Sequence, residues 1–233
     1  MKHTWRNLER LTWWLRRLLY LGIVIDLFSL GSVIHQRKVF RHLLAQGIAV
    51  AESTKAADHA DAWTSGFVSY PVLLVAVATL ILAAVWIYRA AANMHAIRAT
   101  GMTTSPGWAV GWYFIPVANF WKPYQAMREI HEASVRAQQQ QTRATPSLLR
   151  LWWLLWLLGF LIPWFIGTYA GMTARHGNVA AGWLLANAGQ LVSSLIDIPL
   201  SLAFALLIAR IWQMQSMHAA PPSAPTLATE VAG

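Results

Sequence analysis

The polar side chains best suited to chemistry lie inside the most apolar parts of the chain. In the last apolar stretch, five polar residues are spaced 3, 4, 3 and 4 positions apart, which places them on one face of a helix. They are Asn187, Gln190, Ser194, Asp197 and Ser201. In the first apolar stretch, Asp26 shares a helix face with Gly22 and Ser29. A charged aspartate near the bilayer centre costs roughly 2.5–3.5 kcal/mol on insertion scales, so both aspartates should face protein or water.

This polar face has two main interpretations. It can be structural, with hydrogen bonds between helices that contribute about 0.6 kcal/mol each. It can also line a polar pathway or substrate cavity, in which Asp197 accepts a proton during transport. A third and less favoured interpretation is that an aspartate acts as a catalytic acid. Asp26 and Asp197 should sit at similar depth, where no Lys or Arg is available to pair with them. We therefore expect both to point into the bundle as neutral hydrogen-bond donors or toward water.

A second group of polar residues surrounds a proline-rich segment and could bind an anion or another ligand. Its members are Arg89, Asn93, Asn119, Lys122, Tyr124 and Arg128. Cations that converge with the free N–H groups of a helix start form an anion site. The alternative is that these side chains anchor lipid headgroups and cap a broken helix.

Patterns typical of enzymes are missing from the sequence. It has no cysteine, no Gly-x-Ser-x-Gly motif and no metal-spaced pair among its eight histidines. The acidic turn Asp58–Asp61 has no partner cluster and is interpreted as a solvated loop rather than a metal site. We expect no catalytic residues, no metal and no cofactor.

Composition places the chain in a membrane. Of the 233 residues, 57% are hydrophobic and 12% are charged, whereas soluble domains carry about 25% charged residues. The 14 tryptophans suit bilayer interfaces. The net charge of +9 is spread along segment ends instead of forming a stripe, so the expected partner is the lipid bilayer and not nucleic acid.

The fold class that follows is an all-α integral membrane protein with four transmembrane helices and a proline-broken re-entrant or interfacial segment. The spans are expected at about 18–34, 71–92, 151–174 and 180–209, each long enough to cross the hydrocarbon core or nearly so. They form one membrane domain, 18–218, after a cytoplasmic segment, 1–17, and before a disordered cytoplasmic tail, 219–233. Gly167 and Gly171 predict a close helix contact in the third span.

The broken segment covers residues 105–128. Ser105 and Pro106 predict a helix start, Pro116 interrupts that helix, and Lys122 with Pro123 begins a polar surface helix. Residues 108–121 form an apolar piece too short to span, so it should enter one leaflet or lie flat. We expect Arg89 or Asn93 to bond the backbone groups freed by the break.

Orientation follows from positive charge. With four spans and a segment that does not cross, 13 Lys and Arg residues lie on the side of the termini and five on the other side. If the segment crossed, the counts would be eight and ten. The positive-inside rule therefore predicts that both termini are cytoplasmic.

From about residue 70 to residue 215, the chain resembles a bacterial family known as domain of unknown function 4328 (DUF4328). Its hallmark runs from a polar pair on a span, through Ser-Pro-Gly-Trp-Ala-Val-Gly-Trp, to Pro-Tyr and Met-Arg-Glu. The matching residues are Arg89, Asn93, Gly101, Ser105 through Trp112, Pro116, Asn119, Lys122, Pro123, Tyr124, Met127, Arg128 and Glu129. The spacing of Arg89 and Asn93, four apart, departs slightly from the usual one. The resemblance implies a multi-span bacterial membrane protein and implies no activity. We expect the protein in the bacterial cytoplasmic (inner) membrane.

Two functions of different classes remain. The leading hypothesis is a non-enzymatic membrane module that binds a lipid headgroup, a small ligand or a protein partner at a cytoplasm-facing site. The alternative is a small transporter or proton-linked channel that uses the polar face, which would need a homo-oligomer because four helices rarely enclose a pore. A cavity touching Asp26 and Asp197 would favour transport, and a pocket confined to Arg89, Asn119 and Lys122 would favour binding.

Overall fold

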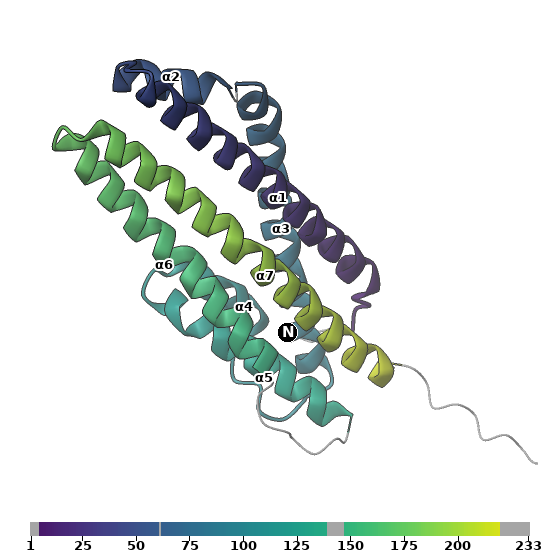
Figure 1. The fold of residues 1–233 in the computed structure, drawn as a ribbon. Helices are drawn as coiled ribbons and strands as arrows, with labels where there is room; N and C mark the ends of the chain where they lie inside the picture. Colours follow the sequence, from purple (N-terminus) through teal and green to yellow (C-terminus); the bar gives the residue numbers. More distant parts are fainter. Residues whose placement is uncertain (1–4, 61, 139–146, 220–233) are drawn as a thin grey trace, which may run out of the picture.

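The computed structural model describes residues 5–60, 62–138 and 147–219, and this part of the chain is helical without strands (Figure 1). The expected tail therefore lies almost wholly outside the described residues, as does Asp61. The α-helices are α1 Glu9–Ala45, α2 Val50–Ala60, α3 Ala62–Ala96, α4 Pro106–Gly111, α5 Lys122–Ala137, α6 Ser147–Arg175 and α7 Val179–Ala219. Two short 3-10 turns, η1 Trp112–Phe114 and η2 Ala118–Phe120, lie between α4 and α5.

Four of these helices are long and apolar enough to cross a membrane, which confirms the four-span fold. They are α1, the Val72–Ala96 part of α3, α6, and α7 up to Met217. Large apolar side chains such as Leu74, Phe165 and Leu195 are exposed on them, as expected of surfaces that face lipid. At 1.5 Å per residue, α7 is about 60 Å long, twice the hydrocarbon thickness, so its ends extend beyond the core.

Helices α6 and α7 form a tight antiparallel hairpin. Gly177, in a left-handed conformation with φ of 90°, makes the turn, and Asn178 Oδ1 accepts a hydrogen bond from the Ala181 N–H at 3.1 Å. Gly182 permits the close approach, because a Cβ there would lie 2.7 Å from the Ala174 Cβ. The expected contact at Gly167 and Gly171 is wrong for the described chain, since both positions face open space.

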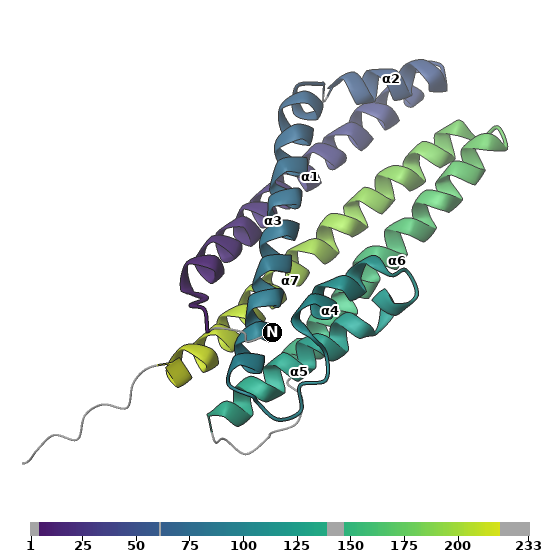
Figure 2. The same cartoon turned by 180° about the vertical axis from the view of Figure 1, so that it is seen from behind.

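Helix α1 runs along the opposite side of α7 (Figure 1). At one end of the bundle, the Phe40 and Trp183 rings pack with centroids 4.4 Å apart. Helix α3 packs on α1 and on α4, but it does not pack along α6 within the described residues. Figure 2 shows α3 diverging from the α6–α7 hairpin.

The segment between α3 and α5 is broken as the sequence predicted. Ser105 caps α4, its Oγ accepting a hydrogen bond from the Trp108 N–H at 3.4 Å, and Pro106 occupies the first turn. We call residues 105–121 the motif segment. Its aromatic side chains, together with Tyr124 of α5, pack against a row of aromatics on α6. The ring pairs are Tyr113–Trp156, Phe120–Phe160 and Tyr124–Trp153, with centroids 6.1–6.3 Å apart.

The loop that leads into the motif segment is attached to α5. The carboxylate of Glu129 accepts hydrogen bonds from the backbone N–H groups of Thr103 and Thr104, at 3.0 and 2.8 Å, and from the Thr103 hydroxyl. The Arg136 guanidinium donates to the carbonyl of Thr100 at 2.8 Å. These contacts hold the motif segment in the angle between α3 and α6.

Candidate functional site

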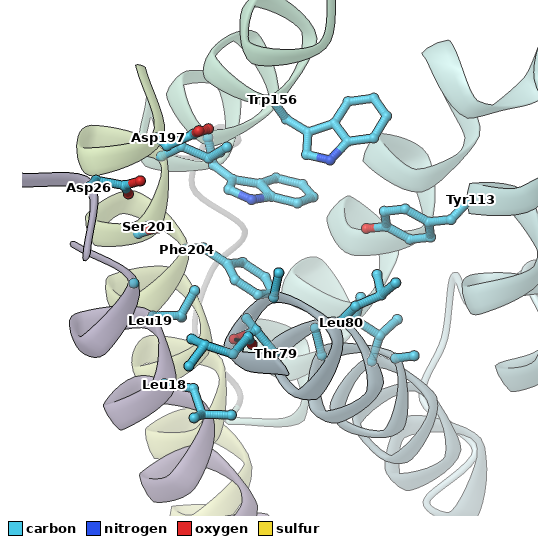
Figure 3. Close-up of a pocket in the computed structure, with 18 of the residues that line it drawn as sticks. Leu18, Leu19, Asp26, Thr79, Leu80, Tyr113, Trp156, Asp197, Ser201 and Phe204 are labelled. Atoms are coloured by element: carbon cyan, nitrogen blue, oxygen red, sulfur yellow. Dashed lines mark hydrogen bonds between the residues drawn. The ribbon is translucent and has the colours of Figure 1, made fainter. Parts of the chain in front are cut away.

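A cavity of about 710 Å³ lies among the membrane-spanning helices (Figure 3). Helices α1, α3, α6 and α7 all contribute to its lining, and Val110, Tyr113 and Phe114 of the motif segment line it as well. It exists because α3 and α6 diverge and are joined by the motif segment at one end instead of packing together. The cavity therefore lies at the level of the spans, and not at the polar surface of the motif.

Two carboxyl groups line this cavity. Asp26 comes from the middle of α1 and Asp197 from the middle of α7, and Figure 3 shows their carboxyls close together. No hydrogen bond or ion pair joins either one to another described residue. Gly159 of α6 leaves room beside Asp197, because a Cβ there would lie 3.6 Å from Asp197 Oδ1. Both carboxyls thus face the bundle interior, and both are free to meet a ligand or water.

Aromatic side chains line much of the rest of the cavity. Tyr113 directs its hydroxyl toward the space that the carboxyls face (Figure 3), and that oxygen is buried without a hydrogen-bond partner among the described residues. Trp156 lies beside Tyr113, and its ring stacks on Trp153 with centroids 4.9 Å apart. Phe204 of α7 adds a further ring, stacked on Trp152. A buried hydroxyl without a hydrogen bond destabilises the folded protein, so we expect water or a ligand to bind to this group.

The polar face of α7 divides into two parts. Toward the Phe40 end, Asn187 Nδ2 donates to Gln36 Oε1 of α1 at 3.1 Å, which is an interhelical hydrogen bond. Gln190 is exposed and Ser194 is buried. Farther along the helix, Asp197 and Ser201 line the cavity. On α1, Gly22 and Asp26 line it too, whereas Ser29 is half-buried.

Asn93, predicted as a ligand-binding residue, instead holds the N-terminal segment. Its amide accepts from the Arg6 N–H at 2.9 Å and donates to the Arg6 carbonyl at 3.0 Å. The second Nδ2 hydrogen reaches Gln215 Oε1 at 3.0 Å, and Gln215 Nε2 donates to Ser134 Oγ at 3.1 Å. This buried network joins α3, α5 and α7 to the chain start. Asn93 therefore makes no described hydrogen bond to the backbone groups that the break in the motif segment frees, although the sequence analysis named it as one of two candidates for that role.

The other residues of that predicted set are dispersed. Arg128 pairs with Glu132 at 3.5 Å, four residues along the same helix. Lys122 Nζ lies 5.4 Å from the Trp112 ring centroid, and Tyr124 packs on Trp153. The Oδ1 of Asn119 is buried without a described partner. The remaining member, Arg89, is half-buried near the end of α3. Of the six, Asn93 alone lines a described cavity, a smaller one of about 380 Å³ beside the N-terminal segment.

Sequence reasoning ended the inward face of α7 at Ser201, and it missed Tyr113 and Trp156 as residues that line the cavity. The 3, 4 spacing of the polar face continues through Phe204, Ile208 and Ile211 to Gln215, and all four are buried. The same helix face therefore meets the bundle along its whole length. Tyr113 and Trp156 carried no signal of their own, because aromatic residues are frequent in both segments.

A comparison with protein families gives one match over most of the chain. The family model described as "Domain of unknown function (DUF4328)" matches residues 49–213. This range contains α3, the motif segment and Asp197, whereas α1 with Asp26 precedes it. No curated protein and no solved structure matches the chain in the corresponding comparisons.

Proposed function

The chain belongs to the DUF4328 family, and we propose that it is a multi-pass membrane module that binds an apolar or amphipathic small molecule in the cavity between its spans. The observation that carries this proposal is the cavity itself. Its volume of about 710 Å³ falls in the range of small-molecule sites, roughly 300–1,000 Å³. Its lining is apolar apart from a few polar groups, which is the usual composition of such sites.

The divergence of α3 from α6 supports a route of entry from the bilayer. A molecule that partitions into lipid could reach the cavity between these helices without crossing a polar surface. The proposal places the ligand in the cavity and not at the motif, because several motif residues are occupied by contacts within the protein. Glu129, Asn93 and Arg128 all have protein partners in the structure.

Proton-linked transport is the second candidate, and the cavity that touches Asp26 and Asp197 is the observation that the sequence analysis named in its favour. It is ranked second because the cavity by itself provides a place for a ligand and not a path across the membrane. Asp26 and Asp197 face the same cavity from two different helices. A carboxyl that can exchange its proton with water in the cavity could couple the movement of a proton to the movement of a substrate. This function would require a second opening, supplied by helix movement or by a homo-oligomer. For either function we propose the cytoplasmic membrane of a bacterium, with both termini inside, from the charge distribution.

A matched pair of glycines on α1 tests the binding proposal. Gly22 lines the cavity and Gly31 is exposed outside it, and a Cβ at either position meets nothing within 4 Å. Gly22→Trp should fill part of the cavity, while Gly31→Trp adds the same side chain toward lipid. The probe is a neutral dodecyl alcohol with a diazirine at mid-chain, photolysed in vesicles, with labelled residues located by mass spectrometry.

The wild type and Gly31→Trp should be labelled at cavity residues such as Ala84, whereas Gly22→Trp should lose that labelling. Labelling of lipid-facing Leu195 should be equal in all three and serves as the internal reference. Absence of cavity labelling in the wild type, or equal cavity labelling in Gly22→Trp, would refute the proposal.

A further inference from the structure

We propose that the preferred occupant of the cavity is an amphipathic cation, with its charged group beside Asp26 and Asp197 and its apolar body among the spans. This inference rests on the proposed function and specifies its ligand class. It depends on three features of the lining: the sign of its charge, the nature of its rings and one unpartnered hydroxyl.

The described side chains of the cavity that can carry a full charge near neutral pH are both acids. Asp26 and Asp197 line it, and no Lys or Arg is present among the described residues of the lining. Within a bilayer, a carboxylate without a partner is strongly disfavoured. A cation between the two groups would favour the ionised form of a carboxyl and provide its missing partner, whereas an anionic headgroup would find no positive partner at the same place.

The rings of the cavity suit the same kind of ligand. Trp152, Trp156 and Phe204 line it together with Tyr113. Cations are attracted to the faces of aromatic rings, most strongly to Trp, and alkylammonium groups are commonly bound in cages of such rings. Because the rings and the carboxyls face one space, both attractions could act on one ammonium group (Figure 3).

The hydroxyl of Tyr113 is a third observation, independent of the carboxyls and the rings, that indicates a polar group in the ligand. It is buried without a described partner, and it points into the cavity from the side opposite the carboxyls. It could accept a hydrogen bond from an ammonium N–H or donate to an oxygen of the ligand. Leu18, Leu80 and Ile87 supply the apolar wall along which an alkyl chain would lie.

Two probes of equal length test this inference. One is the neutral diazirine alcohol described above, and the other replaces the hydroxyl with a primary ammonium. Labelling at Ala84 is divided by labelling at Leu195 in the same sample, which corrects for different partitioning into lipid. In the wild type we expect this ratio to be about tenfold higher for the amine than for the alcohol.

The double variant Asp26→Asn with Asp197→Asn keeps the shape of both side chains and removes their charge. Its amine ratio should fall to the alcohol ratio, while the alcohol ratio stays at the wild-type value and shows that the cavity is intact. Tyr113→Phe should lower the amine ratio by a smaller factor. If the wild type takes up both probes equally, or the double variant keeps the amine preference, the cation inference fails and the binding proposal survives. If neither probe labels the cavity, both fail.

Discussion

The Glu129 carboxylate accepts a hydrogen bond of 2.8 Å from the backbone N–H of Thr104, which lies 25 residues earlier in the sequence. Thr104 immediately precedes Ser105, the cap of α4, and its carbonyl oxygen lies 2.9 Å from the Nε2 of His95. The start of the motif segment is therefore held by Glu129 of α5 together with His95 of α3. Because the motif segment closes one end of the cavity, Glu129 supports the site without lining it.

The stability of the protein should depend on the ionisation of Glu129. Partial burial of this side chain disfavours its charged form, but the hydrogen bonds from Thr103 and Thr104 outweigh burial and hold the pKa below its ordinary value of 4.5. A lowered folded pKa means that the contribution is complete above pH 4.5 and is lost as pH falls through the folded value. In detergent, Glu129→Gln should reduce stability by about 1 kcal/mol at pH 7, a value discounted for the partial exposure of the group.

The thermal midpoints of the wild type and Glu129→Gln should converge as pH is lowered below 4.5, because the wild-type carboxylate then gains a proton. Glu132→Gln is the control, since Glu132 makes only longer, partly exposed ion pairs with Arg128 and Arg136. A gap between wild type and Glu129→Gln that is the same at pH 4 and pH 7 would contradict the role assigned to this carboxylate.

Removal of the Asn93 amide should free the N-terminal segment. Asn93→Ala leaves the backbone groups of Arg6 and the amide oxygen of Gln215 without their described partners, so we expect a loss of about 2 kcal/mol. Thermal unfolding in detergent and tryptic cleavage near Arg6 and Arg10 measure the two effects. Asn178→Ala, which removes an exposed cap, is the comparison. Equal cleavage of Asn93→Ala and the wild type would show that the network does not hold this segment.

Gly101 should tolerate a side chain less well than Gly177. Both glycines have positive φ, 82° and 90°, so alanine at either position incurs about 1 kcal/mol of backbone strain. At Gly101 a Cβ would also lie 2.5 Å from Arg136 Nη2, whereas at Gly177 it would meet nothing within 4 Å. Gly101→Ala should therefore lower the thermal midpoint more, since Arg136 must leave the Thr100 carbonyl. Equal midpoints for the two variants would be evidence against this tight contact.

Local chemistry explains which parts of the fold the sequence could predict. The span positions followed from uncharged runs, and the start of α4 followed from Ser105 and Pro106, whose effects act within one helical turn. The break after Gly111 was predictable for the same reason, with Pro116 close by.

Long-range partners were beyond a single sequence. Nothing near Asn93 indicates Gln215, 122 residues away, and nothing near Asp26 indicates that α3 diverges from α6. The prediction of a close helix contact at Gly167 and Gly171 was wrong because the spacing of the glycines does not determine which face of α6 packs against α7. Gly167 and Gly171 match a packing motif, yet the side chains that pack turn Gly159 toward α7 instead.

The orientation of the bundle can be tested because the chain lacks cysteine. Asn178 lies in the exposed turn between α6 and α7, and Met217 lies exposed at the opposite end of α7. With both termini cytoplasmic, Asn178→Cys should react with an impermeant maleimide in intact cells, and Met217→Cys should react only after the membrane is permeabilised. The cysteine-free wild type gives the background. The reverse pattern would invert the proposed orientation.

The central claim is that the space between α3 and α6 is a binding site, and an experimental structure in lipid bilayer discs without added ligand tests it most directly. We predict non-protein density between the Asp197 carboxyl and the Tyr113 hydroxyl, bounded by the Trp156 ring. A structure in which α3 has closed on α6, with Ala83 against Trp156 and no volume between them, would contradict the claim.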